Sequence, residues 1–92
     1  MSKKLVVYSM KGCPHCDSFK TKLKENKIKF INRDIEKHKE EYDLFRNVKN
    51  DLVPAFMIVD VENPSSSELF APDIDYKDFT TAINIINERV IV

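Results

Sequence analysis

The chain has 92 residues, of which 42% are hydrophobic and 33% charged, and it contains a single glycine. This length and composition predict one small globular domain over residues 1–92 and exclude disordered, collagen-like and flexible-linker architectures. The 15 basic and 15 acidic residues give a formal net charge of zero, which argues against a dedicated nucleic-acid binder, and no run reaches the ~18 apolar residues of a membrane span.

The first two predicted elements are a strand and a helix joined by a turn. Residues 5–8 form a short β-branched and aromatic run that stops at residues 9–12, which is typical of a buried strand followed by a turn. A helix is expected over residues 14–24, because its apolar residues recur at helical spacing while its lysines point elsewhere. Those apolar residues are Cys16, Phe19 and Leu23.

A second strand and a second helix follow. Residues 27–33 alternate in polarity and predict a strand, with Ile28, Phe30 and Ile31 as its apolar residues. A helical period returns over residues 36–49, where Asp34 is a candidate cap and acidic residues suit the first turns. The expected apolar face of this helix contains Leu44, Phe45 and Val48.

The last three predicted elements are two strands and a helix. Residues 55–59 are almost continuously apolar, which favours a central strand covered on both faces. A turn cluster separates this strand from a short one at residues 68–71, so the two should form a hairpin. The last helix should begin near Asp73 or Asp75 and end at about Arg89. Its expected buried residues are Phe79, Ala82, Ile83, Ile86 and Val90.

The resulting order is β-α-β-α-β-β-α, which predicts an α/β fold. A β-α-β start makes the first two strands parallel with a right-handed crossover. We therefore expect a four-stranded mixed sheet flanked by three helices. Active residues in such folds gather where the carboxyl end of a strand meets the amino end of a helix.

The two cysteines of the chain, Cys13 and Cys16, lie at such a junction. The chain shows no targeting segment, which predicts a cytoplasmic location, and in a reducing compartment a redox or metal role is more common than a structural disulfide. At this spacing a helix places both side chains on one face, close enough to form a disulfide.

The two sulfurs should differ in acidity. As a helix N-cap, Cys13 would accept hydrogen bonds from the free amides of His15 and Cys16 and lie at the positive end of the helix dipole, which favours the thiolate. Pro14 suits the first helical position, where no amide hydrogen is needed. Cys16 lies on the apolar face and lacks these advantages. We therefore expect Cys13 to be the nucleophile and Cys16 the resolving thiol.

A short strand, Cys13-Pro14-His15-Cys16 at the start of a helix, and Val53-Pro54 before the third strand together resemble a glutaredoxin. The resemblance covers nearly the whole chain and implies a thioredoxin-like fold. In that family the proline that matches Pro54 is cis, and the residue before it, here Val53, presents its backbone to an extended thiol substrate. A simple strand-entry proline is the alternative interpretation.

Two further residues are candidates for modulating the thiolate. Glutaredoxins usually have tyrosine at the position of His15, whereas Pro-His between the cysteines resembles the periplasmic disulfide oxidases. An imidazole there can donate a hydrogen bond or a charge to the Cys13 thiolate, which predicts a more oxidising couple than that of a Cys-Pro-Tyr-Cys protein. Lys11 could reach the thiolate or a glutathione carboxylate, and the alternative is a lysine that faces solvent.

The resemblance implies glutathione as a co-substrate and no tightly bound cofactor or metal. The segments that hold its carboxylates in the family differ here, because Asp51 would repel a carboxylate and Pro72 removes a backbone donor. Either Asp73 or Asp75 could match the family's aspartate that receives the γ-glutamyl ammonium, and helix capping explains both equally well. The expected substrate and glutathione contacts are Tyr8, Val53, Pro54, Asp73, Ile74 and Asp75.

The function that the resemblance implies is that of a monomeric dithiol oxidoreductase with a redox-active disulfide between Cys13 and Cys16. It would reduce protein disulfides and glutathionylated proteins, and small glutaredoxins, including those of phages, commonly reduce ribonucleotide reductase. Three alternatives stay open: thioredoxin reductase as the electron donor, a redox-inactive adaptor, and metal binding. The metal would be zinc held by the cysteines with His15 or His38, or an iron–sulfur cluster that two subunits share with outside thiols. The sequence lacks the second ligand pair that zinc sites normally add to one Cys-x-x-Cys.

The zero net charge conceals a division along the chain. Residues 1–33 carry nine of the 15 basic residues and two of the 15 acidic ones, which gives +7, so the rest of the chain carries −7. Solvated helix faces are the simpler interpretation of this segregation. The other is a bipolar surface whose basic part favours an anionic thiolate and an anionic tripeptide, and which makes partner association sensitive to salt.

Overall fold

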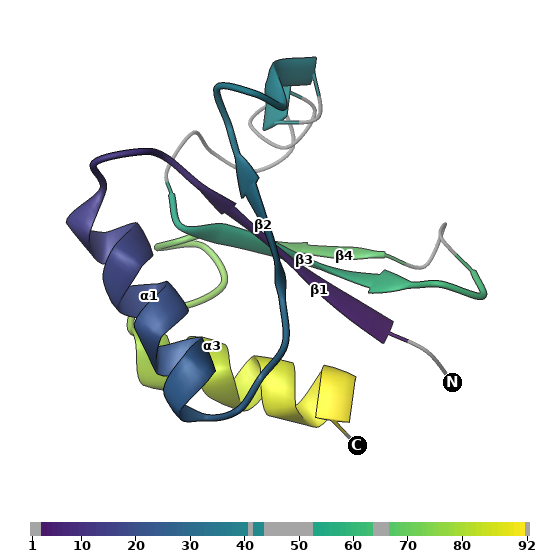
Figure 1. Ribbon diagram of the computed structural model, residues 1–92. Coiled ribbons are helices and arrows are strands. Elements are labelled where there is room, and N and C mark those ends of the chain that lie inside the picture. The colour runs from purple at the N-terminus through teal and green to yellow at the C-terminus, as the bar shows by residue number, and fades with distance from the viewer. Residues whose placement is uncertain (1–2, 41, 44–52, 64–66, 92) are drawn as a thin grey trace.

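The computed structural model describes residues 3–40, 42–43, 53–63 and 67–91. Within these residues the chain forms one sheet and two helices of eight residues or more (Figure 1). The strands are β1 (Lys3–Ser9), β2 (Ile31–Asp34), β3 (Ala55–Asp60) and β4 (Glu68–Phe70). The helices are α1 (Pro14–Glu25) and α3 (Phe79–Ile86), and a π-helical segment, η2 (Asn87–Ile91), extends α3. In this described part, no helix is long and apolar enough to cross a membrane.

The sheet has the mixed topology that the sequence predicts. Its strand order is β2-β1-β3-β4. β1 pairs in parallel with β2, as the β-α-β start requires, and antiparallel with β3. β3 and β4 form the expected antiparallel hairpin. The two most apolar strands, β1 and β3, are therefore the two central ones.

One face of the sheet packs against α1 and α3. Leu5 and Val7 point to this face from β1, because alternate residues of a strand share a face. The two helices lie beside each other on this side (Figure 1). The helical side chains in this core are Phe19 and Leu23 from α1 and Ala82, Ile83 and Ile86 from α3. The apolar face predicted for each helix is therefore the face that is buried.

The opposite face is covered by the segment that follows β2. Val6 and Tyr8 point to this side and pack in a second cluster with Tyr42, Ala55 and Ala71. The rings of Tyr8 and Tyr42 lie 6.3 Å apart. Both faces of β1 and β3 are therefore buried at the end of the sheet where β1 ends, which fixes the position of the turn that follows β1.

The second strand begins later than predicted, at Ile31 instead of residue 27. The residues before it end α1 in a Schellman motif: the Lys27 amide donates to the Lys24 carbonyl at 3.0 Å, and the Ile28 amide donates to the Leu23 carbonyl at 2.9 Å. Lys27 accordingly has a left-handed backbone, with φ at 58°. Ile28 is buried as the hydrophobic residue of this motif, whereas Ile31 is 41% exposed. The alternation in polarity over residues 27–33 therefore covers both the end of α1 and the beginning of β2.

The last helix also begins later than predicted, at Phe79. Its N-cap is Asp78, whose carboxylate accepts a hydrogen bond from the Thr81 amide at 2.7 Å and whose pKa is lowered mainly by that bond. Asp73 instead has a left-handed backbone, with φ at 67°. Asp75 accepts a hydrogen bond from the Ala71 amide at 2.8 Å. Residues 71–78 therefore form a loop before α3, hereafter the 71–78 loop.

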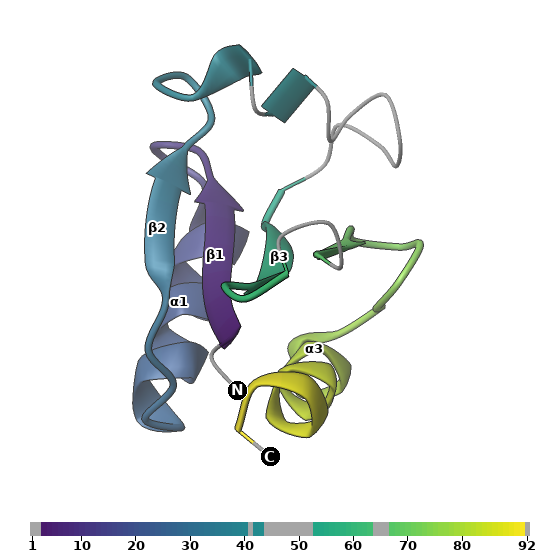
Figure 2. The same ribbon diagram turned by 90° about the vertical axis from the view of Figure 1, so that its right-hand side faces the viewer.

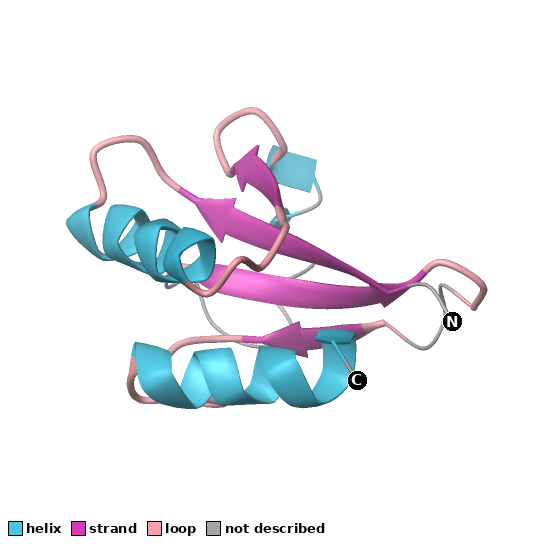
Figure 3. Ribbon diagram, turned by 60° about the horizontal axis from the view of Figure 1, so that its bottom comes forward, coloured by secondary structure: helices cyan, strands magenta, loops and turns pink. Residues whose placement is uncertain are grey.

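The helical segment after α3 contacts β4 through Arg89. Arg89 in η2 forms a salt bridge of 2.6 Å with Glu68, and its guanidinium lies 5.5 Å from the centre of the Phe70 ring. The helical segment runs alongside β4 (Figure 3). Phe79 is half-buried against the core as expected, and the side chain of Val90 lies outside the described residues.

The predicted second helix is described only in part. Asp34 caps the turn after β2, where its carboxylate accepts a hydrogen bond from the Glu36 amide at 2.9 Å. Residues 39–40 and 42–43 are helical. The expected apolar residues of this helix, Leu44, Phe45 and Val48, lie outside the described residues.

Candidate active site

The turn after β1 places Cys13 at the start of α1. Gly12 has φ at +80°, a left-handed conformation that glycine adopts without strain. The next residue, Cys13, is extended, with φ at −93° and ψ at 108°, and its Sγ accepts a hydrogen bond from the Cys16 amide at 3.2 Å. Pro14 occupies the first helical position. Cys13 is therefore the N-cap, as the sequence predicts, although the described bond comes from Cys16 alone and not also from His15.

Both thiols are buried, but they differ in environment. Cys13 is 8% exposed and Cys16 is fully buried on the core side of α1. Burial is the main reason why the pKa of the Cys16 thiol is raised from 9.0 to about 12, and a side-chain hydrogen bond with Cys13 contributes to the rise. Cys16 is thus a protonated thiol at neutral pH, which suits a resolving role and not a first attack.

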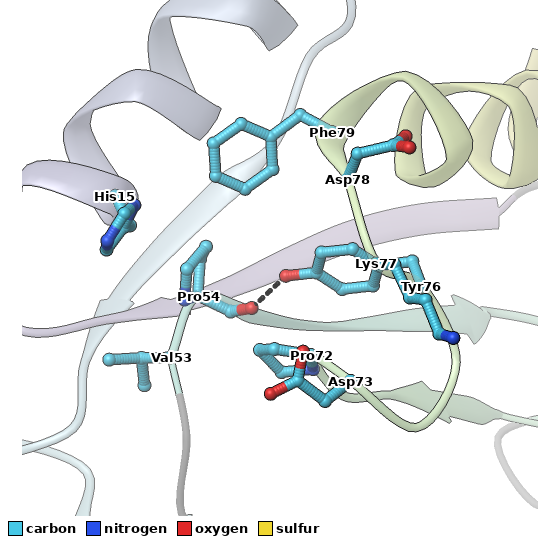
Figure 4. Close-up of a pocket in the computed structure, with 9 residues that line it drawn as sticks. All are labelled: His15, Val53, Pro54, Pro72, Asp73, Tyr76, Lys77, Asp78 and Phe79. Atoms are coloured by element: carbon cyan, nitrogen blue, oxygen red, sulfur yellow. Dashed lines mark hydrogen bonds between the residues drawn. The ribbon is translucent and has the colours of Figure 1, made fainter.

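A pocket of about 420 Å³ lies beside the start of α1 (Figure 4). Three parts of the chain surround it: the first turn of α1, the segment before β3, and the 71–78 loop with the start of α3. The Val53–Pro54 peptide bond is cis, which the resemblance implied for Pro54. The lining residues are His15, Val53, Pro54, Pro72, Asp73, Tyr76, Lys77, Asp78 and Phe79.

Four residues singled out from the sequence meet in this pocket. His15 is exposed and forms one wall, opposite the 71–78 loop (Figure 4). Val53 is half-buried and Pro54 buried between these walls, and Asp73 reaches the pocket from the loop. The sequence therefore identified residues from each of the three surrounding segments.

Other predicted contacts do not line the pocket. Tyr8 is fully buried, because the strand alternation turns its side chain to the face that Tyr42 covers. Ile74 is 53% exposed on the loop, and Asp75 is directed to the Ala71 amide. Lys11 is exposed in the turn. The predicted repulsive residue, Asp51, lies outside the described residues.

The sequence reasoning missed Tyr76 as a site residue. Its hydroxyl donates a hydrogen bond to the Pro54 carbonyl oxygen, and its side chain is 5% exposed. The expected helix start at Asp73 or Asp75 placed this tyrosine within a helix, so no pattern marked it as part of the site. A helix start at Asp78 would have left it in a loop beside the pocket.

The described residues offer little for a metal ion. Among residues 3–40, 42–43, 53–63 and 67–91, no group of three or more His, Cys, Asp or Glu side chains is arranged to hold one. His38 is exposed and lies in the segment after β2, whereas the two cysteines lie at the start of α1.

Comparison with protein families gives one match and comparison with curated proteins gives none. The model of the glutaredoxin family matches residues 5–62. No curated protein matches the chain. The family match includes Cys13, Cys16 and the Val53–Pro54 segment and ends before the 71–78 loop. With both cysteines inside a match that spans more than half of the chain, this protein belongs to the glutaredoxin family.

Proposed function

We propose that this glutaredoxin is a dithiol enzyme that reduces protein disulfides and glutathione mixed disulfides through Cys13 and Cys16. The family supports thiol–disulfide oxidoreductase activity in general. The observation that carries the more specific proposal is the contrast between the two sulfurs, since one caps a helix and accepts a backbone amide hydrogen, whereas the other is a fully buried thiol whose pKa is raised.

The first chemical step is attack by the Cys13 thiolate on one sulfur of the substrate disulfide. A mixed disulfide forms between Cys13 and that sulfur, and the other substrate sulfur leaves as a thiolate. Cys16 then loses its proton and attacks the Cys13 sulfur, which releases the second substrate thiol. The substrate gains two electrons and two protons, and the enzyme is left with a Cys13–Cys16 disulfide.

Glutathione regenerates the dithiol in this proposal. One glutathione thiolate attacks the enzyme disulfide, and a second releases the first as oxidised glutathione. Asp73 lines the pocket, whereas the Asp75 carboxylate accepts a hydrogen bond from the Ala71 amide. This difference favours Asp73 as the partner of the γ-glutamyl ammonium. Val53 would hold the extended backbone, and Lys11 is the candidate partner of a carboxylate.

Thioredoxin reductase is the second candidate electron donor, because the composition of the pocket opposes tight glutathione binding. Asp73 and Asp78 place two carboxylates where an anionic tripeptide would bind, against Lys77. Pro72 offers no amide hydrogen to a carboxylate. Because Asp73 alone would suffice for the γ-glutamyl ammonium, the additional carboxylate of Asp78 and the missing donor at Pro72 weaken glutathione binding relative to a pocket with one aspartate and more backbone donors. As physiological setting we propose a cytoplasmic monomer acting on proteins such as ribonucleotide reductase, with the family resemblance as support.

A turnover assay distinguishes the two donors. Reduction of one protein disulfide is followed by NADPH consumption, in one arm with glutathione and glutathione reductase and in the other with thioredoxin reductase. We expect turnover in the glutathione arm at least tenfold above that in the other arm. Turnover in the thioredoxin reductase arm alone would show that this reductase, and not glutathione, is the electron donor. Turnover in neither arm would refute the proposed activity.

A further inference from the structure

A buried tyrosine joins the Val53–Pro54 segment to the 71–78 loop. Tyr76 is 5% exposed, and its hydroxyl donates a hydrogen bond to the carbonyl oxygen of Pro54, 22 residues away in the sequence. The hydroxyl reaches across from the loop to this carbonyl (Figure 4). Tyr76 lies outside residues 5–62, the part of the chain that the family model matches. One partner of the contact, Pro54, therefore lies inside the matched residues and the other, Tyr76, outside them.

The ring that carries this hydroxyl is held by three phenylalanines. Its centroid lies 6.3 Å from that of Phe19 in α1, with the planes 18° apart, and 5.7 Å from that of Phe56 in β3. Phe79 at the start of α3 lies 6.4 Å away. Each aromatic pair adds to the apolar area buried around the ring. The position of the hydroxyl is therefore fixed by α1, β3 and α3 together.

The backbone of Tyr76 is also fixed. Its carbonyl accepts a hydrogen bond from the Asp73 amide at 2.8 Å, which closes the loop on itself. Burial raises the pKa of the Tyr76 hydroxyl well above 10, and the negative charge of Asp73 raises it further. The hydroxyl therefore remains a donor when Cys13 is a thiolate.

We propose that Tyr76 is a positioning residue whose hydroxyl holds the Pro54 carbonyl and thereby orients the Val53 backbone toward an extended disulfide substrate. This proposal rests on the proposed function. Without the hydroxyl, the Pro54 carbonyl loses its partner and the segment before β3 can shift. Displacements of about 1 Å in substrate-positioning groups can lower rates by ~100-fold. A small reagent that contacts only the Cys13 sulfur does not use the Val53 backbone.

The test is the substitution Tyr76→Phe, which removes one oxygen and keeps the aromatic contacts. Tyr42→Phe is the matched control, since Tyr42 is also 5% exposed but packs in the cluster on the other face of the sheet. The two readouts are kcat/KM for a glutathionylated peptide and the rate at which iodoacetamide alkylates Cys13. For Tyr76→Phe we expect kcat/KM to fall about tenfold, mainly through KM, while alkylation stays within twofold of wild type.

Several outcomes would overturn the proposal. One is a kcat/KM for Tyr76→Phe that equals that of Tyr42→Phe and of an active wild type. Another is a parallel fall in kcat/KM and alkylation together with the melting temperature, which would show a merely structural role. An inactive wild type would instead refute the proposed function.

A measurement on the wild-type protein covers the case in which Tyr76→Phe does not fold. We expect the hydroxyl proton of Tyr76 to exchange slowly with water and to be visible by NMR, because it is buried and bonded to the Pro54 carbonyl. A hydroxyl proton that exchanges as fast as that of an exposed tyrosine would overturn the proposal.

Discussion

Cys13 and Cys16 are separated by two residues, yet the helix start places their sulfurs in different environments. Cys13 lies outside the first turn, where its sulfur accepts a backbone amide hydrogen. Cys16 lies inside that turn, against the core, where burial opposes ionisation. A single helical turn thus separates the sulfur proposed to attack from the sulfur proposed to resolve.

Selective alkylation tests this difference. In the reduced, folded protein at pH 8, iodoacetamide should modify Cys13 and leave Cys16 unmodified, because Cys16 is fully buried and its pKa is raised to about 12. Mass spectrometry of the proteolytic peptides measures both sites. After unfolding in urea, both cysteines should react. Modification of Cys16 in the folded protein at a rate similar to that of Cys13 would show that the sulfur is accessible and ionised.

The raised pKa of Cys16 also fixes the sign of a pH effect on stability. The folded state disfavours the thiolate, whereas the unfolded chain ionises near the ordinary value of 9.0. The contribution of this group to folding is therefore complete below pH 9 and is lost as the pH rises from 9 toward 12. Tyr76, whose pKa is also raised by burial, acts in the same direction above pH 10.

At the scale of single elements, the two helix ends show what local sequence can and cannot specify. Three aspartates, at positions 73, 75 and 78, precede α3, and each is a suitable N-cap by residue type. Local hydrogen bonds within the loop distinguish them, because the Asp75 carboxylate accepts from the Ala71 amide and the Asp73 amide donates to the Tyr76 carbonyl. The sequence predicted the helix and its buried face correctly but not its first residue.

The end of α1 was mispredicted for a different reason. A Schellman motif usually has glycine in its left-handed position, and Lys27 occupies it here. Without the glycine signal, Ile28 was assigned to a strand although it packs beside Leu23. The lack of a glycine at position 27 also costs free energy, because a residue that carries a Cβ is strained in the left-handed conformation.

The substitution Lys27→Gly should therefore stabilise the protein. The relief of left-handed strain exceeds the loss from the more flexible unfolded glycine, for a gain of about 0.5–1 kcal/mol. The free energy of unfolding, measured by urea titration, reports this gain. Lys24→Gly is the matched control, because Lys24 lies within α1 and the change should cost about 1 kcal/mol. A destabilised Lys27→Gly variant would contradict the assignment of the motif.

At the scale of the whole molecule, the basic part of the chain is divided between two ends. The turns before and after α1 lie at opposite ends of the helix (Figure 2). Because α1 has 12 residues, these two ends are about 18 Å apart. Four lysines line a second pocket of about 400 Å³ at the end away from Cys13. They are Lys3, Lys4, Lys27 and Lys29. These four lysines of residues 1–33 therefore lie away from the Cys13 sulfur that the basic part was expected to favour.

The site itself was predictable where its chemistry is local in sequence. Cys13, Pro14 and Cys16 follow from one helix start, and the cis bond at Pro54 was implied by the family resemblance. Tyr76 was not predictable, because its role depends on a hydrogen bond across 22 residues that only the folded sheet brings about. The burial of Tyr8 was not predictable either, because it depends on Tyr42, which the fold brings from the segment after β2.

The proposed division of roles between the two sulfurs is tested by measuring the activities of Cys13→Ser and Cys16→Ser on two substrates, a glutathionylated peptide and a protein disulfide. Serine is a good N-cap, so Cys13→Ser should keep the helix start and lose both activities. Cys16→Ser should still remove glutathione from the peptide, because glutathione itself resolves that mixed disulfide, and should lose reduction of the protein disulfide. An equal loss of both activities in Cys16→Ser would contradict the division of roles between the two sulfurs.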